Sequence, residues 1–190
     1  MWYLGVGATA KITKSEDDLL TILSTTLESQ GWKLRSGGRG EVEDALILGV
    51  ENSQNKEVIL PYPQFRQYDV GQPSVDAFSS YSDGLQRKAC GTSEVHYLGG
   101  KIISPLHKNL LGSGASLVLG KNLSTPVRFG ITIIRNIGAP ADTCKGYLEG
   151  PMFRLMREHT IPLFNLAYPP HLSRILDFIN NPKVVGQRQV

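Results

Sequence analysis

Short apolar runs alternate with helical patterns over the first third of the chain. Residues 2–6, 32–35 and 58–60 are apolar runs that each end at glycine or proline, which is typical of a strand entering a turn. A helical pattern begins near Glu41, after the second run. The order strand, helix, strand, helix, strand predicts a parallel sheet with right-handed crossovers.

The helix expected after the first strand has one apolar face. Ser15 is its predicted N-cap, with Asp18 in the third helical position, and Gly31 is expected to end it. Apolar residues at a spacing of three or four are Leu19, Ile22, Leu23 and Leu27. This spacing predicts that the helix packs on the sheet through that face.

The pattern is weaker in the middle of the chain. Residues 64–101 have no clear periodicity, so we expect an insertion or long loop over one edge of the sheet. Beyond them we expect helices at 105–111, 147–159 and 172–179, and strands at 116–119, 127–134 and 162–166. The whole pattern predicts a single α/β domain over residues 1–190, a Rossmann-like three-layer fold whose mostly parallel central sheet has helices on both faces.

Composition fits one globular domain, since the 190 residues are 41% hydrophobic and 19% charged. No apolar stretch approaches the roughly 18 residues of a membrane span, and the amino terminus lacks a basic leader, so we expect a cytoplasmic protein without a membrane partner. Cys90 and Cys144 stand apart from each other and from histidine at ligand spacing. We therefore expect two reduced, inert thiols, no metal site and no cofactor.

Charge is divided unevenly along the chain. Residues 1–60 carry 6 Lys+Arg and 9 Asp+Glu, a balance of −3, whereas residues 61–190 carry 14 and 8, a balance of +6. No run of like charge reaches the length of a nucleic-acid-binding tail. Any anion site is therefore expected to be local.

The segment WKLRSGGRGEVEDA places a glycine-rich turn between a strand and a helix. Backbone N–H groups at such a turn can hold a phosphate, to which Ser36 would add a hydroxyl and Arg39 a guanidinium. Gly37 and Gly38 would let the anion approach the backbone closely. The spacing matches neither GxGxxG nor the NTPase phosphate loop. A bare glycine turn therefore stays open as the alternative.

Three segments in order resemble one known superfamily: GWKLRSGG with Ala45 and Gly49 downstream, PLHKNLLGSGASLVLGKNLSTPVRF, and IPLFNLA. They are similar to SLOG proteins, which include DNA-processing protein A and the lonely-guy phosphoribohydrolases, and most similar to uncharacterised bacteriophage members. The resemblance covers most of the chain, least certainly residues 64–101. It implies a pocket for a phosphorylated or nucleotide-like ligand at the carboxyl edge of the sheet.

The resemblance carries residues into that pocket with some departures. Ser36, Gly37 and Gly38 match the family's first loop, SGGARGAD. The loop differs from the family at Arg39, Glu41 and Glu43. Ile47 stands where the family has a carboxylate on the following helix. The ligand-binding candidates are Gly7, Ala8, Thr9, Ser36, Gly37, Gly38, Arg39, His107, Asn109, Arg135, Gly138, Lys145, Gly146, Glu149 and Gly150.

Catalysis is less clearly implied. Phosphoribohydrolases carry a PGGxGTxxE-like loop, whereas the corresponding GAPADTCKGYLEGPMFR has neither paired glycines nor the Thr-to-Glu spacing. Glu149 and Glu43 are the only candidate acids. Arg135 follows the apolar strand at 127–134 and is either an anion contact or an exposed side chain, and His107 and Asn109 match an LHxRN-like element of the group.

Three functions follow as expectations. The first is recognition of a nucleotide or nucleotide-derived ligand without catalysis, and in a phage this would suit capture of a host defence signal. The second is an N-glycosidase or phosphoribohydrolase-like hydrolase. The third is single-stranded DNA binding like that of DNA-processing protein A. Relatives commonly form homo-oligomers, so we expect self-association as well.

Overall fold

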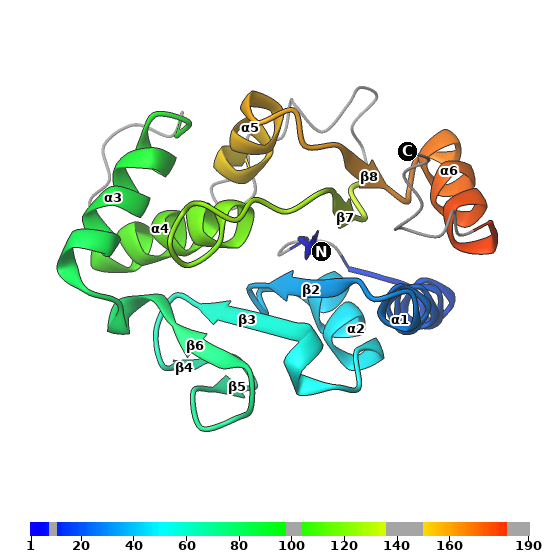
Figure 1. Ribbon diagram of the computed structural model, residues 1–190, viewed down its shortest axis with the longest axis horizontal. Coiled ribbons are helices and arrows are strands. Elements are labelled where there is room, and N and C mark those ends of the chain that lie inside the picture. The colour runs from blue at the N-terminus through cyan, green and yellow to red at the C-terminus, as the bar shows by residue number, and fades with distance from the viewer. Residues whose placement is uncertain (8–10, 98–103, 136–149, 182–190) are drawn as a thin grey trace, which may run out of the picture.

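The computed structural model describes residues 1–7, 11–97, 104–135 and 150–181 (Figure 1). Its main sheet has six parallel strands in the order β6-β3-β2-β1-β7-β8. These strands are β1 (Trp2–Gly5), β2 (Lys33–Ser36), β3 (Lys56–Leu60), β6 (Val75–Ala77), β7 (Gly130–Thr132) and β8 (Leu163–Asn165). The predicted α/β class and Rossmann-like parallel sheet are confirmed.

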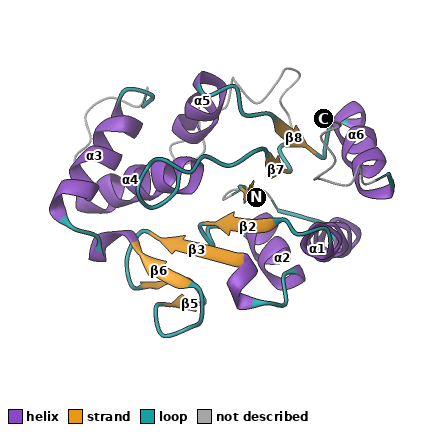
Figure 2. Ribbon diagram, viewed as in Figure 1, coloured by secondary structure: helices purple, strands orange, loops and turns teal. Residues whose placement is uncertain are grey.

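Helices cover both faces of this sheet (Figures 1 and 2). The helices are α1 (Lys14–Ser29), α2 (Glu41–Gly49), α3 (Asp83–Glu94), α4 (Pro105–Leu119), α5 (Gly150–Glu158) and α6 (Pro169–Asn180), with 3₁₀ turns η1 (Ser53–Asn55) and η2 (Phe78–Ser80). Strands β4 (Gln64–Phe65) and β5 (Tyr68–Asp69) form a separate antiparallel hairpin. No helix within the described ranges is long and apolar enough to cross a membrane.

Side chains that alternate along the strands divide the core into two layers. Tyr3 and Ile131 belong to the apolar cluster under α1, α2 and α6. Leu4 and Val6 belong to the cluster under α4 and α5. Helix α3 packs on α4 at the end of that second layer (Figure 1). We call these layers the α1/α2 face and the α4/α5 face.

The first helix begins earlier than predicted. Thr13, not Ser15, is the N-cap, because Glu16 in the third helical position completes a capping box with it: the Thr13 side chain accepts from the Glu16 N–H, and the Glu16 carboxylate accepts from the Thr13 N–H at 2.8 Å. Leu20 takes the core position expected of Ile22, whose side chain is 62% exposed.

The strand predicted at 116–119 is wrong, because these residues are the last turn of α4. All residues of α4 from Leu110 onward are buried. Small residues allow this close packing: a Cβ atom on Gly112 would lie 2.2 Å from the Phe78 ring. A helix buried on all sides lacks the polar face that gives a helical pattern its period. The sequence therefore resembled a short helix followed by a strand.

Residues 64–101 are more regular than the expected long loop. They contain β6, which extends the main sheet beside β3, and helix α3. The only buried residues of α3 are Ala89 and Ser93, which explains the weak apolar periodicity. The strand predicted at 127–134 is shorter than expected, since β7 spans Gly130–Thr132.

Candidate functional site

The sheet order places a topological switch point at the carboxyl ends of β1 and β7. After β1 the chain builds β2, β3 and β6 on one side, and it then returns to add β7 on the other side. Helices α1 and α5, which follow β1 and β7, lie on opposite faces of the sheet, as around the crevices where parallel α/β sheets bind ligands. Gly7 follows β1 at this edge, and Arg135 follows β7.

A buried carboxylate occupies the glycine-rich turn that follows β2. Glu43, in the first turn of α2, is fully buried. Its Oε2 accepts from the N–H groups of Gly37 at 2.9 Å and Arg39 at 3.0 Å, and from the Ser36 hydroxyl at 3.2 Å. Its Oε1 accepts from the Gly7 N–H at 3.2 Å. Glu43 thus joins the loops that follow β1 and β2.

This arrangement differs from the expected phosphate cradle. The N–H groups of Gly7, Gly37 and Arg39 already donate to an anion that the chain itself supplies. Burial raises the pKa of Glu43, while the Arg39 guanidinium and the loop N–H groups act in the opposite direction. With both oxygens engaged, Glu43 holds the loops together and is poorly placed to act as a catalytic acid.

The outer side of the same turn is closed by the β4–β5 hairpin. Arg66 donates to the Gly38 carbonyl at 3.0 Å and forms an ion pair with Asp44 at 2.8 Å. Tyr68 donates to Asp44 at 2.9 Å, and its ring leaves no room for a Cβ atom on Gly38, whose φ is +59°. Gly38 is therefore required for the shape of the turn.

Arg39 points into the α4/α5 face and is 4% exposed. Its Nη2 donates to the Leu110 carbonyl at 3.0 Å and to the Ser113 hydroxyl at 2.7 Å, and its Nη1 lies 3.8 Å from the Met152 sulfur. The guanidinium thus lies between α4 and the first turn of α5. It is a buried cation held by the protein's own contacts, whereas the sequence predicted a guanidinium that contacts a phosphate.

Three hydroxyls in the described part of the chain are buried without a hydrogen-bond partner, and one of them lies at the end of β7. This is Thr132 Oγ1. Gly130, two residues earlier on the same face of the sheet, lies against Met156 of α5: a Cβ atom there would be 2.7 Å from its methyl group. Met156 of α5 therefore packs on β7, on the face of the sheet to which Thr132 also belongs.

Arg135 is held by the start of α1. Its guanidinium forms an ion pair with Glu16 and donates to the Lys11 carbonyl. Lys11 in turn pairs with Glu41, which also accepts from the Ile12 N–H at 3.0 Å. The residue after β7 therefore braces the entrances of α1 and α2. Arg135 is exposed, as one of the two alternatives expected, and the anion that it contacts is a carboxylate of the chain itself.

His107 and Asn109 lie in the first turns of α4 and have different surroundings. The His107 N–H donates to the hydroxyl of the N-cap Ser104 at 3.3 Å. Asn109 lines a pocket between α3 and α4. Gly150 is the buried first residue of α5. The remaining candidates lie outside the described residues, namely Ala8, Thr9, Gly138, Lys145, Gly146 and Glu149.

The sequence-based prediction missed Thr132. In VRFGITII it is the only hydroxyl residue, and the residues from Phe129 onward are otherwise apolar, so that signal was available. Arg39 lies beside Met152 at the start of α5, and Met156 of the same helix lies against β7, the strand that ends at Thr132. Nowhere in the described part do three or more His, Cys, Asp or Glu side chains gather so that they could hold a metal ion.

Comparison of the chain with models of known families, with curated proteins and with solved structures finds no significant match. The resemblance to SLOG proteins therefore stays a prediction.

Proposed function

We propose that this protein binds a small phosphorylated ligand, a nucleotide or a nucleotide derivative, at the carboxyl edge between β1 and β7, and does not transform it. The observation that carries this proposal is Thr132. A buried hydroxyl without a partner costs about 1–3 kcal/mol, so native proteins rarely keep one that nothing ever satisfies. A bound ligand at the switch point would supply the missing partner.

The surroundings favour an anionic group on that ligand. The first N–H groups of a helix have no partner within the helix and carry a partial positive charge. Helix α5 packs on β7, the strand that ends at Thr132. The Arg39 guanidinium adds a full positive charge at the first turn of α5, where its Nη1 lies 3.8 Å from the Met152 sulfur. Phosphate combines negative charge with several acceptor oxygens, which suits a hydroxyl, helix N–H groups and a guanidinium together.

Recognition without turnover is favoured by the environment of Glu43. This candidate acid already accepts four hydrogen bonds inside the protein. A general acid has to pass its proton to the substrate, whereas both carboxylate oxygens of Glu43 are already engaged by the loops. The nucleotide part of the proposal rests on the resemblance, which also suggests a phage protein that captures a defence signal and self-associates.

A ligand panel tests the proposal. Purified protein is melted with inorganic phosphate, nucleoside monophosphates, cyclic nucleotides and ADP-ribose, each against the matching nucleoside where one exists. We expect a phosphorylated compound to raise the melting temperature, because a ligand at 100 times its Kd stabilises by about 2.7 kcal/mol. The nucleoside alone should have little effect.

The same panel separates the three functions. Chromatography of each mixture after incubation should show intact nucleotide, since free base would indicate a hydrolase. A single-stranded oligonucleotide should bind weakly, whereas tight and strongly salt-dependent binding would indicate a DNA-binding protein. If no phosphorylated compound raises the melting temperature and none is released on denaturation, the proposal is wrong.

A further inference from the structure

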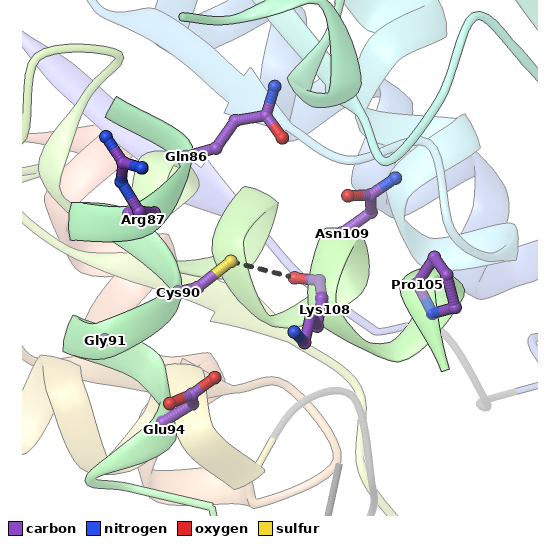
Figure 3. Close-up of a pocket in the computed structure, with 8 residues that line it drawn as sticks. All are labelled: Gln86, Arg87, Cys90, Gly91, Glu94, Pro105, Lys108 and Asn109. Carbon is purple, nitrogen blue, oxygen red and sulfur yellow. Dashed lines mark hydrogen bonds between the residues drawn. The ribbon is translucent and has the colours of Figure 1, made fainter. Parts of the chain in front are cut away.

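A second pocket lies between α3 and α4, on the side of α4 that faces α3 (Figure 3). Its volume is about 440 Å³, within the range of small-molecule sites. Helix α3 contributes Gln86, Arg87, Cys90, Gly91 and Glu94, and α4 contributes Pro105, Lys108 and Asn109. Arg39 contacts α4 through Leu110 and Ser113, which do not line this pocket, so the two sites are separate.

Among the described residues, the three charged residues of this pocket lack the ion pairs that several other charged residues of the protein form. Lys11, Lys121 and Arg66 all form ion pairs. By contrast, Arg87, Lys108 and Glu94 form no ion pair with any residue in the described part of the chain. Charges that line a concave site without internal partners are available to a ligand.

The order of the charges along α3 is informative. Arg87 and Glu94 are seven residues apart, so they lie two turns apart on one side of the helix, roughly 10 Å along its axis. Cys90 lies between them, and its Sγ is 3.4 Å from the Lys108 carbonyl across the pocket. The walls thus present cations at Arg87 and Lys108 and an anion at Glu94 (Figure 3).

We propose that this pocket binds a small zwitterion whose carboxylate or phosphate contacts Arg87 and Lys108 and whose ammonium group faces Glu94. The amide of Asn109 lies at the same pocket and offers a further hydrogen bond. The site is distinct from the carboxyl-edge site of the proposed function and does not depend on it.

Cys90 provides a reporter for occupancy. Its thiol is half-buried in the pocket wall, and burial raises its pKa. Protein with Cys144→Ser leaves Cys90 as the sole cysteine. The rate at which iodoacetamide alkylates Cys90 at pH 8.5 is then measured by mass spectrometry. The two probes are 10 mM 4-aminobutyrate for the carboxylate class and 10 mM O-phosphoethanolamine for the phosphate class, with NaCl at equal ionic strength as reference.

We expect at least one probe to slow alkylation threefold or more, and the probe that does so identifies the anionic class. The double variant Arg87→Ala, Lys108→Ala should lose the protection. Lys88→Ala, an exposed cation of the same helix outside the pocket, should keep it. The proposal is overturned if neither probe slows the reaction beyond NaCl, or if the double variant is protected as well as the parent. Succinate protecting as well as 4-aminobutyrate would overturn the role of Glu94.

Discussion

The two faces of the sheet differ in whether their buried polar groups have hydrogen-bond partners. On the α1/α2 face, Tyr3 and Ser24 share a hydrogen bond of 2.7 Å, and the Ser24 hydroxyl donates to the Leu46 carbonyl at 2.6 Å. On the α4/α5 face, the hydroxyls of Tyr81, Ser116 and Thr132 are buried without a hydrogen-bond partner among the described residues. The first face is satisfied by its own contacts, whereas the second contains groups that its own packing does not explain.

Because this kind of fold serves many activities, a functional site has to be found from particular residues, and buried polar groups without partners indicate one. A buried polar group is retained when something satisfies it or when its position is useful. The α4/α5 face also contains Arg39, held between two helices beside the carboxyl edge. We therefore assign ligand binding to this face and structural support to the other.

The largest expected effect comes from Glu43, which reaches from α2 to the loops between the two faces. Glu43→Ala leaves four donors and the nearby Arg39 without their carboxylate, so we expect a loss of about 3–5 kcal/mol in the free energy of unfolding. Urea unfolding measures it. Glu41→Ala, in the same turn of α2 but on the surface, should cost far less.

Stabilisation of Glu43→Ala by a small carboxylate is a second test of the role of Glu43. Formate fits the space that the Glu43 side chain leaves and can accept from the same N–H groups. We expect 50 mM formate to raise the melting temperature of Glu43→Ala more than that of the parent, with chloride as control. Equal shifts would contradict the interpretation of the turn as a built-in anion site.

Two glycine-to-alanine substitutions, one on each face, are expected to cause intermediate losses of stability. On the α1/α2 face, a Cβ atom on Gly49 would lie 2.3 Å from the Thr21 carbonyl oxygen, which is backbone and cannot easily move. On the other face, the obstacle to Gly112→Ala is the edge of the Phe78 ring, which can shift. We expect Gly49→Ala to cost about 3 kcal/mol and Gly112→Ala about 1–2 kcal/mol.

Gly91→Ala is the matched control for both glycine variants. Gly91 lies in α3 with nothing near its missing Cβ atom, so alanine should stabilise the helix by about 0.5–1 kcal/mol. Thermal unfolding of the three variants ranks them. A larger loss for Gly112→Ala than for Gly49→Ala would show that the α4/α5 face is the more rigid one.

Much of the α1/α2 face could be predicted from sequence, because its elements are local and amphipathic. The apolar runs and turn glycines indicated β1, β2 and β3, and the spacing of Leu23 and Leu27 indicated α1. The α4/α5 face was harder to predict. Helix α4 is buried on all sides and α3 buries only Ala89 and Ser93, so neither shows a clear helical period.

The candidate site was predictable only in outline. A parallel sheet implies that Gly7, the glycine turn and Arg135 meet at one edge, and the structure places them there. The partners of these residues depend on tertiary contacts that no local pattern encodes. Glu43 reaching Gly7, Arg66 closing the turn and Glu16 holding Arg135 each join positions far apart in the chain.

A smaller effect is expected from pH on the α1/α2 face. Partial burial by itself raises the pKa of Glu28, but hydrogen bonds from the Asn55 side chain and from the N–H groups of Glu51 and Asn52 outweigh it and hold that pKa below its ordinary value. The unfolded chain therefore takes up this proton first as pH falls below about 4.5, and stability is lost there. Glu28→Gln should weaken this loss in urea titrations between pH 6 and pH 3.5, whereas an unchanged slope would exclude Glu28 as its source.

The most direct test of the ligand-binding claim is Thr132→Val, measured both by unfolding of the ligand-free protein and by titration with the most stabilising nucleotide of the panel. Valine keeps the shape and removes the unpartnered hydroxyl, so we predict a free protein more stable by about 1 kcal/mol and a ligand bound about tenfold more weakly. Ser116→Ala should leave ligand affinity unchanged. Unaltered affinity in Thr132→Val would contradict the assignment of the ligand to the carboxyl end of β7.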